Sequence, residues 1–529
     1  MNDTPLLTLL TLTPVLGAIV LAGLKQHNKA LARTLALVFS VASLAQALLI
    51  WSRFDTAATD LQFPERHTWI PTLGIEYFVG IDGLGLLMVL LSAIVMPMAI
   101  LASWRVEEKA PLYFALLLFL QAGLFGTFTA LNFFHWFLFW ELSLIPAFFL
   151  IRFWGGPERA AASVQFFIYT MVGSVAMLLA FLGIYRATGT FDLIKLAELG
   201  RSGELASYFA VKLAWYGLSK EQLALVIFVM VLLGFAVKVP LMPLHTWLPT
   251  TYAEAPSPIT MVLTGLMSKM GVYGFLRILA PLFPEQMQAA LTPLLWLAVI
   301  TIVLSACAAF AQKDLKRMLA YSSINHLGYC LLGLFAVMSQ FNGGGAGAAG
   351  NAEAVAKLAH EKAAALNGVL LQMFNHGLTA ATLFCFVSFL ERRSGGLRGL
   401  DDFGGLRQVA PVFCRLMGIA TFASLGLPGL NGFVGEFLIF KGAFPLVTWA
   451  TALSTLGLLV TAIFLLTFLQ RVFNGPLNEK WKALPDLTLS ERLIVVPATA
   501  LMFVLGIYPQ LAIGLVNSTV LAMVEGLKL

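Results

Sequence analysis

Long apolar runs separated by short polar stretches make up most of the chain. A helix that crosses a bilayer needs about 20 mostly apolar residues, and the sequence contains about fourteen such runs. They begin near residues 5, 31, 81, 111, 132, 163, 222, 258, 290, 317, 363, 413, 444 and 494. The pattern predicts an all-α polytopic membrane protein with about 14 transmembrane helices.

Composition supports a protein that lies mainly in the lipid bilayer. Hydrophobic residues form 59% of the 529 residues and charged residues 11%, a balance that a water-soluble core of this size does not need. The first apolar run, residues 6–24, follows no basic segment and precedes no small-residue cleavage site. We therefore expect a retained helix rather than a signal peptide.

The net charge of +6 is spread over short loops. Such scatter is typical of basic residues that orient a membrane protein, and it argues against nucleic-acid binding. Lys and Arg are more numerous in the loops on the side of Lys25, Arg105, Lys313 and Lys480. By the positive-inside rule we predict that both termini lie on the non-cytoplasmic side.

Other motifs give no sign of metal, disulfide or nucleotide chemistry. The four cysteines, Cys307, Cys330, Cys385 and Cys414, form no C-x-x-C pair and lie in or beside apolar runs, as packing cysteines do. No glycine-rich phosphate loop follows a strand pattern. The Gly/Ala tract at residues 342–351 is interpreted as a flexible loop.

Prolines and glycines interrupt two of the runs. The seventh contains Pro240 and Pro243, and the twelfth contains Pro428 and Gly429. Helices broken at corresponding places in two halves indicate a transporter built from inverted repeats. The predicted divisions are flanking helices at 1–110, a first five-helix repeat at 111–280, a second at 281–475 and a C-terminal helix at 476–529.

Four ionisable residues, Glu141, Lys238, Lys269 and Glu436, stand alone inside apolar runs. A charge at the bilayer centre costs about 2.5–3.5 kcal/mol on insertion scales, so such residues usually mark an ion or proton path. Three of them also allow a structural interpretation. Glu141 would be a carboxylate at the membrane interface. Lys238 would reach water through the nearby helix break. Lys269 would donate to unpaired backbone carbonyls between helices.

Three histidines extend this set. His326 and His376 each have polar residues three or four positions away, on one face of an apolar helix. A histidine donates and accepts protons near neutral pH, which suits a relay, although a hydrogen-bonded packing histidine fits the same pattern. His245 follows the proline pair and either caps the half-helix or leads protons outward.

A carboxylate beside a buried lysine offers a way to toggle its charge. At about 5 Å and an effective dielectric constant near 20, their attraction is roughly 3 kcal/mol. Moving a proton against about 150 mV costs roughly 3.5 kcal/mol. A Glu141–Lys238 pair that forms and separates would therefore gate a proton step, if an outside source of energy moves it.

Seven motifs in this chain resemble those of the antiporter-like proton-translocating subunits of respiratory complex I. The motifs are FWELSLIP, GFAVKVPLMPLHTWLP, AEAPSP, LMSKMGVYG, QKDLKRMLAYSSINHLGY, QMFNHGLTAATLF and LGLPGLNGFVGEF. The resemblance spans roughly residues 80–475 and implies two inverted five-helix repeats with broken seventh and twelfth helices. It also implies that Glu141 and Lys238 pair, that Lys269 is the central relay and that the last site faces the next subunit.

The last site separates members of this family. Most of them place a lysine where this chain has Glu436, whereas the chain M type carries glutamate, so the resemblance is to chain M. The lack of a long lateral helix after the last span fits the same type. The family pattern LPDAHxEAP stands here as LPTTYAEAP, with Thr250 and Tyr252 replacing an acid and a histidine. This departure puts in doubt any cytoplasmic proton uptake through those positions.

The resemblance implies a membrane subunit of a proton-translocating NADH:quinone oxidoreductase. Redox chemistry in partner chains would drive protons along the intramembrane Glu, Lys and His residues. No cofactor or metal is expected in this chain, and NADH, FMN, iron–sulfur clusters and quinone would belong to partner subunits. The expected partners are the other membrane subunits, including neighbouring antiporter-like subunits and a long lateral helix from one of them. The expected location is the bacterial inner membrane.

Three other interpretations stay open at this stage. The first is a subunit of an Mrp-type cation/proton antiporter without redox partners, against which Glu436 argues. The second is a membrane subunit of a related hydrogenase or of an inorganic-carbon uptake complex. The third is a structural scaffold, in which the intramembrane charges would be dispensable.

Overall fold

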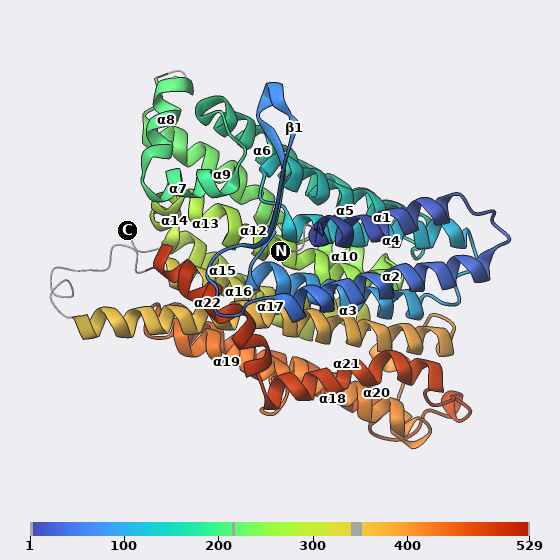
Figure 1. The fold of residues 1–529 in the computed structure, drawn as a ribbon. Helices are drawn as coiled ribbons and strands as arrows, with labels where there is room; N and C mark the ends of the chain where they lie inside the picture. Colours follow the sequence, from blue (N-terminus) through green and yellow to red (C-terminus); the bar gives the residue numbers. More distant parts are fainter. Residues whose placement is uncertain (1–3, 214–216, 340–351, 527–529) are drawn as a thin grey trace.

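The structure is a computed structural model that describes residues 4–213, 217–339 and 352–526. Helices run side by side along the molecule, and a two-stranded hairpin stands at their edge (Figure 1). The all-α membrane class is confirmed. Within the described ranges, 11 helices are long and apolar enough to cross a membrane, and three more apolar helices have 10–17 residues. The total of about 14 spans and the two inverted repeats stay predictions.

Three helices and the hairpin form the N-terminal part. Their bounds are α1 (Leu6–Ala22), α2 (Lys29–Arg53), β1 (Gln62–Ile70), the turn η1 (Pro71–Leu73), β2 (Ile75–Ile81) and α3 (Gly83–Ala102). The strands pair antiparallel, with Arg66 opposite Phe78. Glu65 Oε1 accepts a hydrogen bond from the Leu7 amide (2.8 Å), which satisfies one of the amides that a helix start leaves unpaired. The hairpin thereby fixes the start of α1.

The middle of the chain contains two short surface helices and one span with two wide turns. The bounds are α4 (Ala110–Thr129), α5 (Phe133–Trp154), α6 (Arg159–Thr188), α7 (Leu193–Arg201), α8 (Glu204–Leu213), α9 (Lys220–Lys238), α10 (Trp247–Glu254), α11 (Ser257–Val262), η2 (Leu263–Met267), α12 (Ser268–Gly274), η3 (Phe275–Leu279), α13 (Ala280–Leu282) and α14 (Pro284–Ala289). The turns η2 and η3 are π-helical and lie inside the single span Ser257–Leu282. Such turns are frequent at functional sites.

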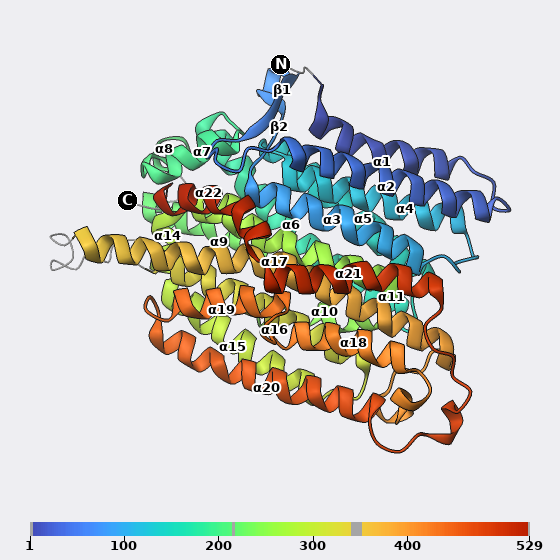
Figure 2. The same cartoon turned by 60° about the horizontal axis from the view of Figure 1, so that its bottom comes forward.

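The last part of the chain contains the longest helix and the second broken one. The bounds are α15 (Leu291–Phe310), α16 (Leu315–Met338), α17 (Ala352–Ser394), η4 (Leu400–Asp402), η5 (Leu406–Gln408), α18 (Pro411–Ser424), α19 (Asn431–Ala443), α20 (Thr448–Phe473), η6 (Glu479–Trp481), α21 (Leu489–Ile507) and α22 (Gln510–Gly526). One end of α17 projects beyond the neighbouring helices (Figure 2). The Gly/Ala tract at 342–351, predicted as a loop, lies outside the described residues.

Both predicted helix breaks are present. The helix α9 ends at Lys238, and α10 starts only at Trp247. The helix α18 ends at Ser424, and α19 starts at Asn431. Backbone groups at the first break find side-chain partners, because the Met242 amide donates to Thr301 Oγ1 (3.0 Å) and Trp247 Nε1 donates to Val237 O (3.0 Å). Irregular backbone at membrane depth is tolerated where protein surrounds it in this way.

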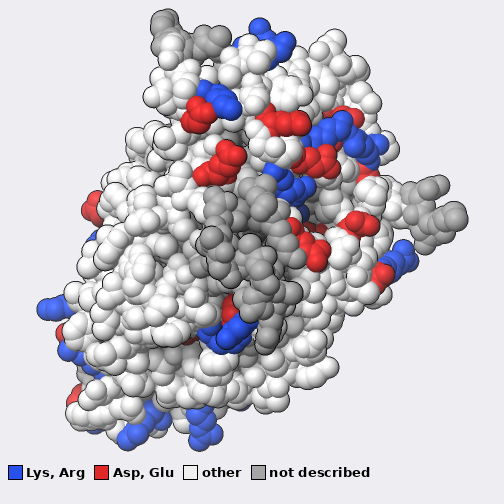
Figure 3. All heavy atoms as spheres, turned by 90° about the vertical axis from the view of Figure 1, so that its left-hand side faces the viewer, with Lys and Arg blue, Asp and Glu red and all other residues white. Residues whose placement is uncertain are grey.

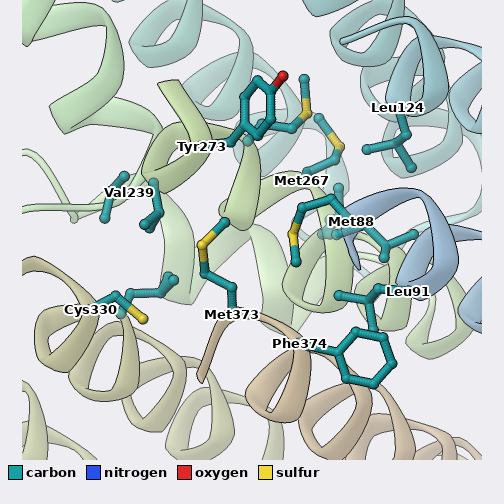
Figure 4. Close-up of a cluster of buried hydrophobic side chains, with 14 of the residues drawn as sticks. Met88, Leu91, Leu124, Val239, Met267, Tyr273, Cys330, Met373 and Phe374 are labelled. Carbon is teal, nitrogen blue, oxygen red and sulfur yellow. The ribbon is translucent and has the colours of Figure 1, made fainter. Parts of the chain in front are cut away.

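Burial separates central helices from peripheral ones. In the most apolar stretch of α17 and of Ser257–Leu282 every residue is buried, against 28% in α2 and 33% in α20. The centre between α3, η2 and α17 holds an apolar cluster that includes Met88, Met267 and Met373 (Figure 4). Side chains on α12 and α17 are therefore kept away from lipid, which is the environment that an intramembrane charge requires.

Candidate proton path

Lys269 lies at the centre of the molecule, in α12 between the two π-helical turns. Its side chain is fully buried. The ammonium Nζ donates to Thr264 O (2.5 Å) and contacts Ser268 Oγ (3.3 Å). It also lies 2.8 Å from His376 Nδ1 on α17. A charged Lys269 donates to that nitrogen, so the neutral His376 carries its proton on Nε2. The predicted central relay therefore has a direct histidine partner.

The two histidines continue the series from α17 to α16. The rings of His376 and His326 lie with their centroids 4.9 Å apart. His326 Nδ1 lies 3.1 Å from Glu436 Oε1. The structure places both predicted histidines, His376 and His326, between Lys269 and Glu436. Four titratable side chains from four helices thus lie in one row.

Hydrogen bonds orient the ring of His326. Its Nδ1 donates to Glu436, and its Nε2 lies 3.2 Å from Ser424 Oγ at the end of α18. Gln372 Nε2 donates to Glu436 Oε1 (3.2 Å) and lies 3.4 Å from His326 Nδ1. Because the Gln372 amide nitrogen only donates, its partner is the carboxylate. The neutral His326 then accepts from the Ser424 hydroxyl and can take up a second proton at that nitrogen.

The break before α19 makes room for the carboxylate of Glu436. Gly426 has a positive φ of 78°, a conformation that favours glycine. A Cβ atom at this position would lie 2.6 Å from Glu436 Oε2. The glycine therefore both turns the chain and leaves space for the side chain that ends the series, which gives the break a function in the site.

The other end of the predicted path is arranged differently. Lys238 is 2% exposed, and its ammonium lies 4.8 Å from the ring centroid of Trp140. Within the described residues, Lys238 Nζ and Glu141 Oε1 have no hydrogen-bond partner. Among the described residues no ion pair joins the two side chains, although their charges still attract each other. The Glu141–Lys238 pair implied by the resemblance is therefore open in this structure.

A small cavity lies between the two lysines. It has a volume of about 10 Å³, and its lining includes Lys238, Tyr252 and Ser268. Tyr252 Oη, like Lys238 Nζ, has no hydrogen-bond partner among the described residues. A cavity of this volume accommodates about one water molecule. Tyr252, where the family pattern has histidine, is thus placed between Lys238 and the Ser268 that contacts Lys269.

His245 lies in the break between α9 and α10, outside the row of contacts. Its ring is 6.3 Å from that of Tyr321. Within the described residues, its Nδ1 has no hydrogen-bond partner. The residue at the start of α10 is Thr246, so His245 is not the N-cap residue of that helix. Both interpretations of His245, as a cap of the half-helix and as an outward path for protons, stay predictions.

Sequence reasoning missed a charged cluster where α10 meets α11. Lys316 on α16 is 2% exposed, and its Nζ donates to Ala255 O (2.5 Å). Glu391 accepts from Ser257 Oγ (2.5 Å) and lies 3.9 Å from Lys316 Nζ. Arg398 pairs with Glu254 (3.3 Å). These residues belong to loop-flanking motifs, so hydropathy assigns them to the surface, and only the packing of α16 and α17 encloses them.

No metal centre is assigned to the chain. Among the residues that the structure describes, no group of three or more His, Cys, Asp or Glu side chains is arranged to hold an ion. The four cysteines are free, and two of them, Cys330 and Cys385, are buried.

The comparison with known families identifies the chain. Residues 130–348 and 354–464 match the family model described as NADH:quinone oxidoreductase/Mrp antiporter, TM. The chain belongs to this family. The antiporter-like resemblance of the motifs is thus confirmed, and the matched residues include all six members of the predicted path. The row of contacts therefore lies in the part of the chain that defines the family.

Relatives and a solved structure extend over nearly the whole chain. The NADH-quinone oxidoreductase subunit M of Rhodobacter capsulatus is 34% identical over 525 residues, which are 98% of this chain and 96% of the relative. The NAD(P)H-quinone oxidoreductase chain 4 2 of Thermosynechococcus vestitus is 34% identical over 518 residues, which are 96% of this chain and 90% of the relative. A chain of the solved structure of respiratory complex I from Thermus thermophilus with bound NADH has a TM-score of 0.82 and 30% sequence identity. The match covers 98% of this chain and 99% of that chain. Among antiporter-like proteins of this family, the subunit M type therefore describes the chain best.

Proposed function

We propose that this chain is the subunit M of a NADH:quinone oxidoreductase and moves protons along a row of intramembrane side chains. Redox chemistry in partner subunits supplies the energy. The proposed path consists of Glu141, Lys238, Lys269, His376, His326 and Glu436. The observation that carries the proposal is the series of contacts from Lys269 through His376 and His326 to Glu436.

The open Lys238 end provides the gate. An ion pair that closes from about 10 Å to about 4 Å gains roughly 2.5 kcal/mol at an effective dielectric constant near 20. This is close to the roughly 3.5 kcal/mol for moving a proton against about 150 mV. With the pair open, Lys238 is held by the Trp140 ring. Closing the pair with Glu141 favours the charged lysine, and opening it favours release of the proton toward Lys269.

The partners of the proposed complex follow from this function. NADH, FMN, iron–sulfur clusters and quinone belong to partner subunits, because the path in this chain contains only proton-carrying groups. Neighbouring antiporter-like subunits adjoin the Glu436 end, and a long lateral helix from one of them runs along the complex. The complex lies in a bacterial inner membrane, with both termini of this chain on the non-cytoplasmic side.

The decisive experiment replaces Lys238 by alanine in the assembled complex. Quinone reduction and proton uptake into sealed vesicles are measured together. We expect Lys238→Ala to lower proton uptake, because the gate loses its titratable group. Lys220→Ala is the matched control, since Lys220 lies on the same helix and is exposed, with only a 3.8 Å contact to Glu221.

Proton uptake by Lys238→Ala equal to that of Lys220→Ala would refute the relay. Subunit content separates the relay from the remaining alternatives. An Mrp-type antiporter would purify without redox subunits. A hydrogenase or carbon-uptake complex would contain hydrogenase or carbonic-anhydrase-like chains, and a scaffold would tolerate every substitution in the path. Co-purification of subunits that oxidise NADH supports the oxidoreductase.

A further inference from the structure

A large cavity lies at one end of the helix bundle, away from the row of titratable contacts. Its volume is about 350 Å³, which has room for on the order of ten water molecules. It lies where α7, α13, α16 and α22 meet, and we call this end the α7–α22 side. Figure 3 views the molecule from this side and shows acidic and basic side chains gathered in its upper right part. Most of the cavity lining is apolar, and its charged residues are Asp60, Asp82, Arg201 and Arg277.

The inner wall of this cavity holds a buried ion pair. Arg277 Nη2 lies 2.5 Å from Asp82 Oδ1, and the two side chains are 15% and 8% exposed. Asp82 also accepts from the Gly85 amide (3.0 Å) and thereby caps α3. Arg277 Nε is buried and has no hydrogen-bond partner among the described residues. Buried donors are almost always satisfied by protein or by ordered water, so this one indicates water in the cavity.

One helix face connects the ion pair with the central lysine. Lys269 and Tyr273 are four residues apart in α12 and lie one above the other. Arg277 follows four residues later, in the π-helical turn η3. Tyr273 Oη donates to Phe128 O (3.2 Å), and the Arg277 guanidinium lies 5.6 Å from the Tyr273 ring centroid. Tyr273 thus lies between Lys269 and Arg277 along the span, and Arg277 lines the cavity.

Apolar side chains separate these groups from bulk water in this conformation. Met267, Tyr273 and Met373 belong to one cluster of buried side chains (Figure 4), and each is at most 3% exposed. Methionine side chains are unbranched and adapt easily to a change of packing. At the same time Lys269 is bound to His376. In this conformation Lys269 is therefore connected with Glu436, and apolar side chains separate it from the water in the cavity.

We propose that the face from Lys269 through Tyr273 to the Arg277–Asp82 pair is a proton outlet to the α7–α22 side, in addition to the row that ends at Glu436. The proposal rests on the proposed function and adds a branch at Lys269. The Lys269 ammonium gives its proton to the Tyr273 oxygen, while the Tyr273 hydroxyl proton passes to water in the cavity. Tyr273 returns to its neutral form and Lys269 is left neutral. Asp82 balances the charge of Arg277, so the arriving proton is not repelled.

The first test measures access of water to the cavity, independently of pumping. In a complex whose subunit M carries serine at its four cysteine positions, Ala280→Cys is exposed to a small cationic methanethiosulfonate added to sealed vesicles. Ala280 lines the cavity. Ala122→Cys, at a fully buried position of α4, is the matched control. We expect Ala280→Cys to react from the α7–α22 side only, and Ala122→Cys to stay unmodified. Equal reactivity of the two cysteines would overturn the outlet.

The second test removes one oxygen atom. Tyr273→Phe keeps the ring and deletes the hydroxyl, and we expect a loss of protons taken up per quinone reduced. Tyr113→Phe is the control, because Tyr113 is equally buried and its hydroxyl contacts only Ser103 (2.9 Å), away from the cavity. An unchanged ratio in Tyr273→Phe rejects the outlet even if the cavity is labelled. The proposed function still stands in that case if Lys238→Ala lowers pumping, so the two failures are distinguishable.

Discussion

The two ends of the proposed path differ in how their ionisable groups are paired. From Lys269 to Glu436 each group contacts the next, and Gln372 and Ser424 supply further hydrogen bonds. At the other end Lys238 lies on an indole ring, and its ammonium has no hydrogen-bond partner in the described chain. Direct contacts of this kind hold the side chains in one geometry, whereas a buried ammonium without a hydrogen bond is costly and favours a rearrangement. The difference suggests that the Lys238 end is the moving part and the Glu436 end the conducting part.

Removal of Lys269 should have the largest effect, because the Lys238 part and the Glu436 part of the proposed path meet at this residue. We expect Lys269→Ala to lower coupled proton uptake about a hundredfold at this subunit, a loss typical of a deleted proton-transfer group. Proton uptake into vesicles at a fixed rate of NADH oxidation measures it. Lys441→Ala serves as control, since Lys441 pairs with Glu361 (2.6 Å) outside the path. Equal uptake in the two variants would contradict the central position of Lys269.

Glu436→Gln tests the conducting end alone. The amide keeps the size of the side chain but cannot bind the transferred proton, so we expect proton uptake to fall about tenfold. Glu479→Gln, at an exposed side chain near η6, controls for the change of charge. Infrared difference spectra should also lose one carboxyl band in Glu436→Gln. Retention of that band would assign it to another carboxylate and remove Glu436 from the path.

Gly426→Ala disturbs the same end without removing a titratable group. The positive φ of Gly426 costs an alanine about 1–2 kcal/mol. The new methyl group also displaces the Glu436 carboxylate from His326. We expect a lower melting temperature of the complex and reduced proton uptake. Gly183→Ala on α6 is the control, because nothing lies within 4 Å of a Cβ there, and a helical alanine is favourable. Equal behaviour of the two variants would show that the break does not position Glu436.

Trp140→Phe tests the contact between the Lys238 ammonium and the indole ring, and it has the smallest expected effect. Phenylalanine is a weaker partner for an ammonium, so the lysine loses about 0.5–1 kcal/mol of attraction to the ring. The Trp140 Nε1 bond to Ser174 (2.9 Å) is lost as well. Loss of that attraction favours closure of the Glu141–Lys238 pair, and we expect a shift of the pumping rate of at most about fivefold, following that energy. Trp296→Phe, on the lipid-exposed surface of α15, should leave the rate unchanged.

Much of the site was predictable because its residues are exceptional in their surroundings. Lys269 and Glu436 stand out in apolar runs, and Pro240 and Pro428 mark the breaks. The pairing of Glu141 with Lys238 stays a prediction, because the separation of the two side chains depends on the rotation of α5 against α9, which the sequence does not give. Gln372 and Ser424 escaped notice as partners, since an amide and a hydroxyl are common in helices and only their position identifies them.

The sequence by itself determined that the chain lies in a membrane and which side chains are ionisable there. Transfer free energies add along a single segment, so a local pattern is sufficient. Only the tertiary structure decided the order of contact, because Lys269, His376, His326 and Glu436 come from four helices that meet through long-range packing. The same packing encloses Arg277 with Asp82 and leaves the Lys238 ammonium without a hydrogen-bond partner among the described residues. Neither result follows from the spacing of residues along the chain.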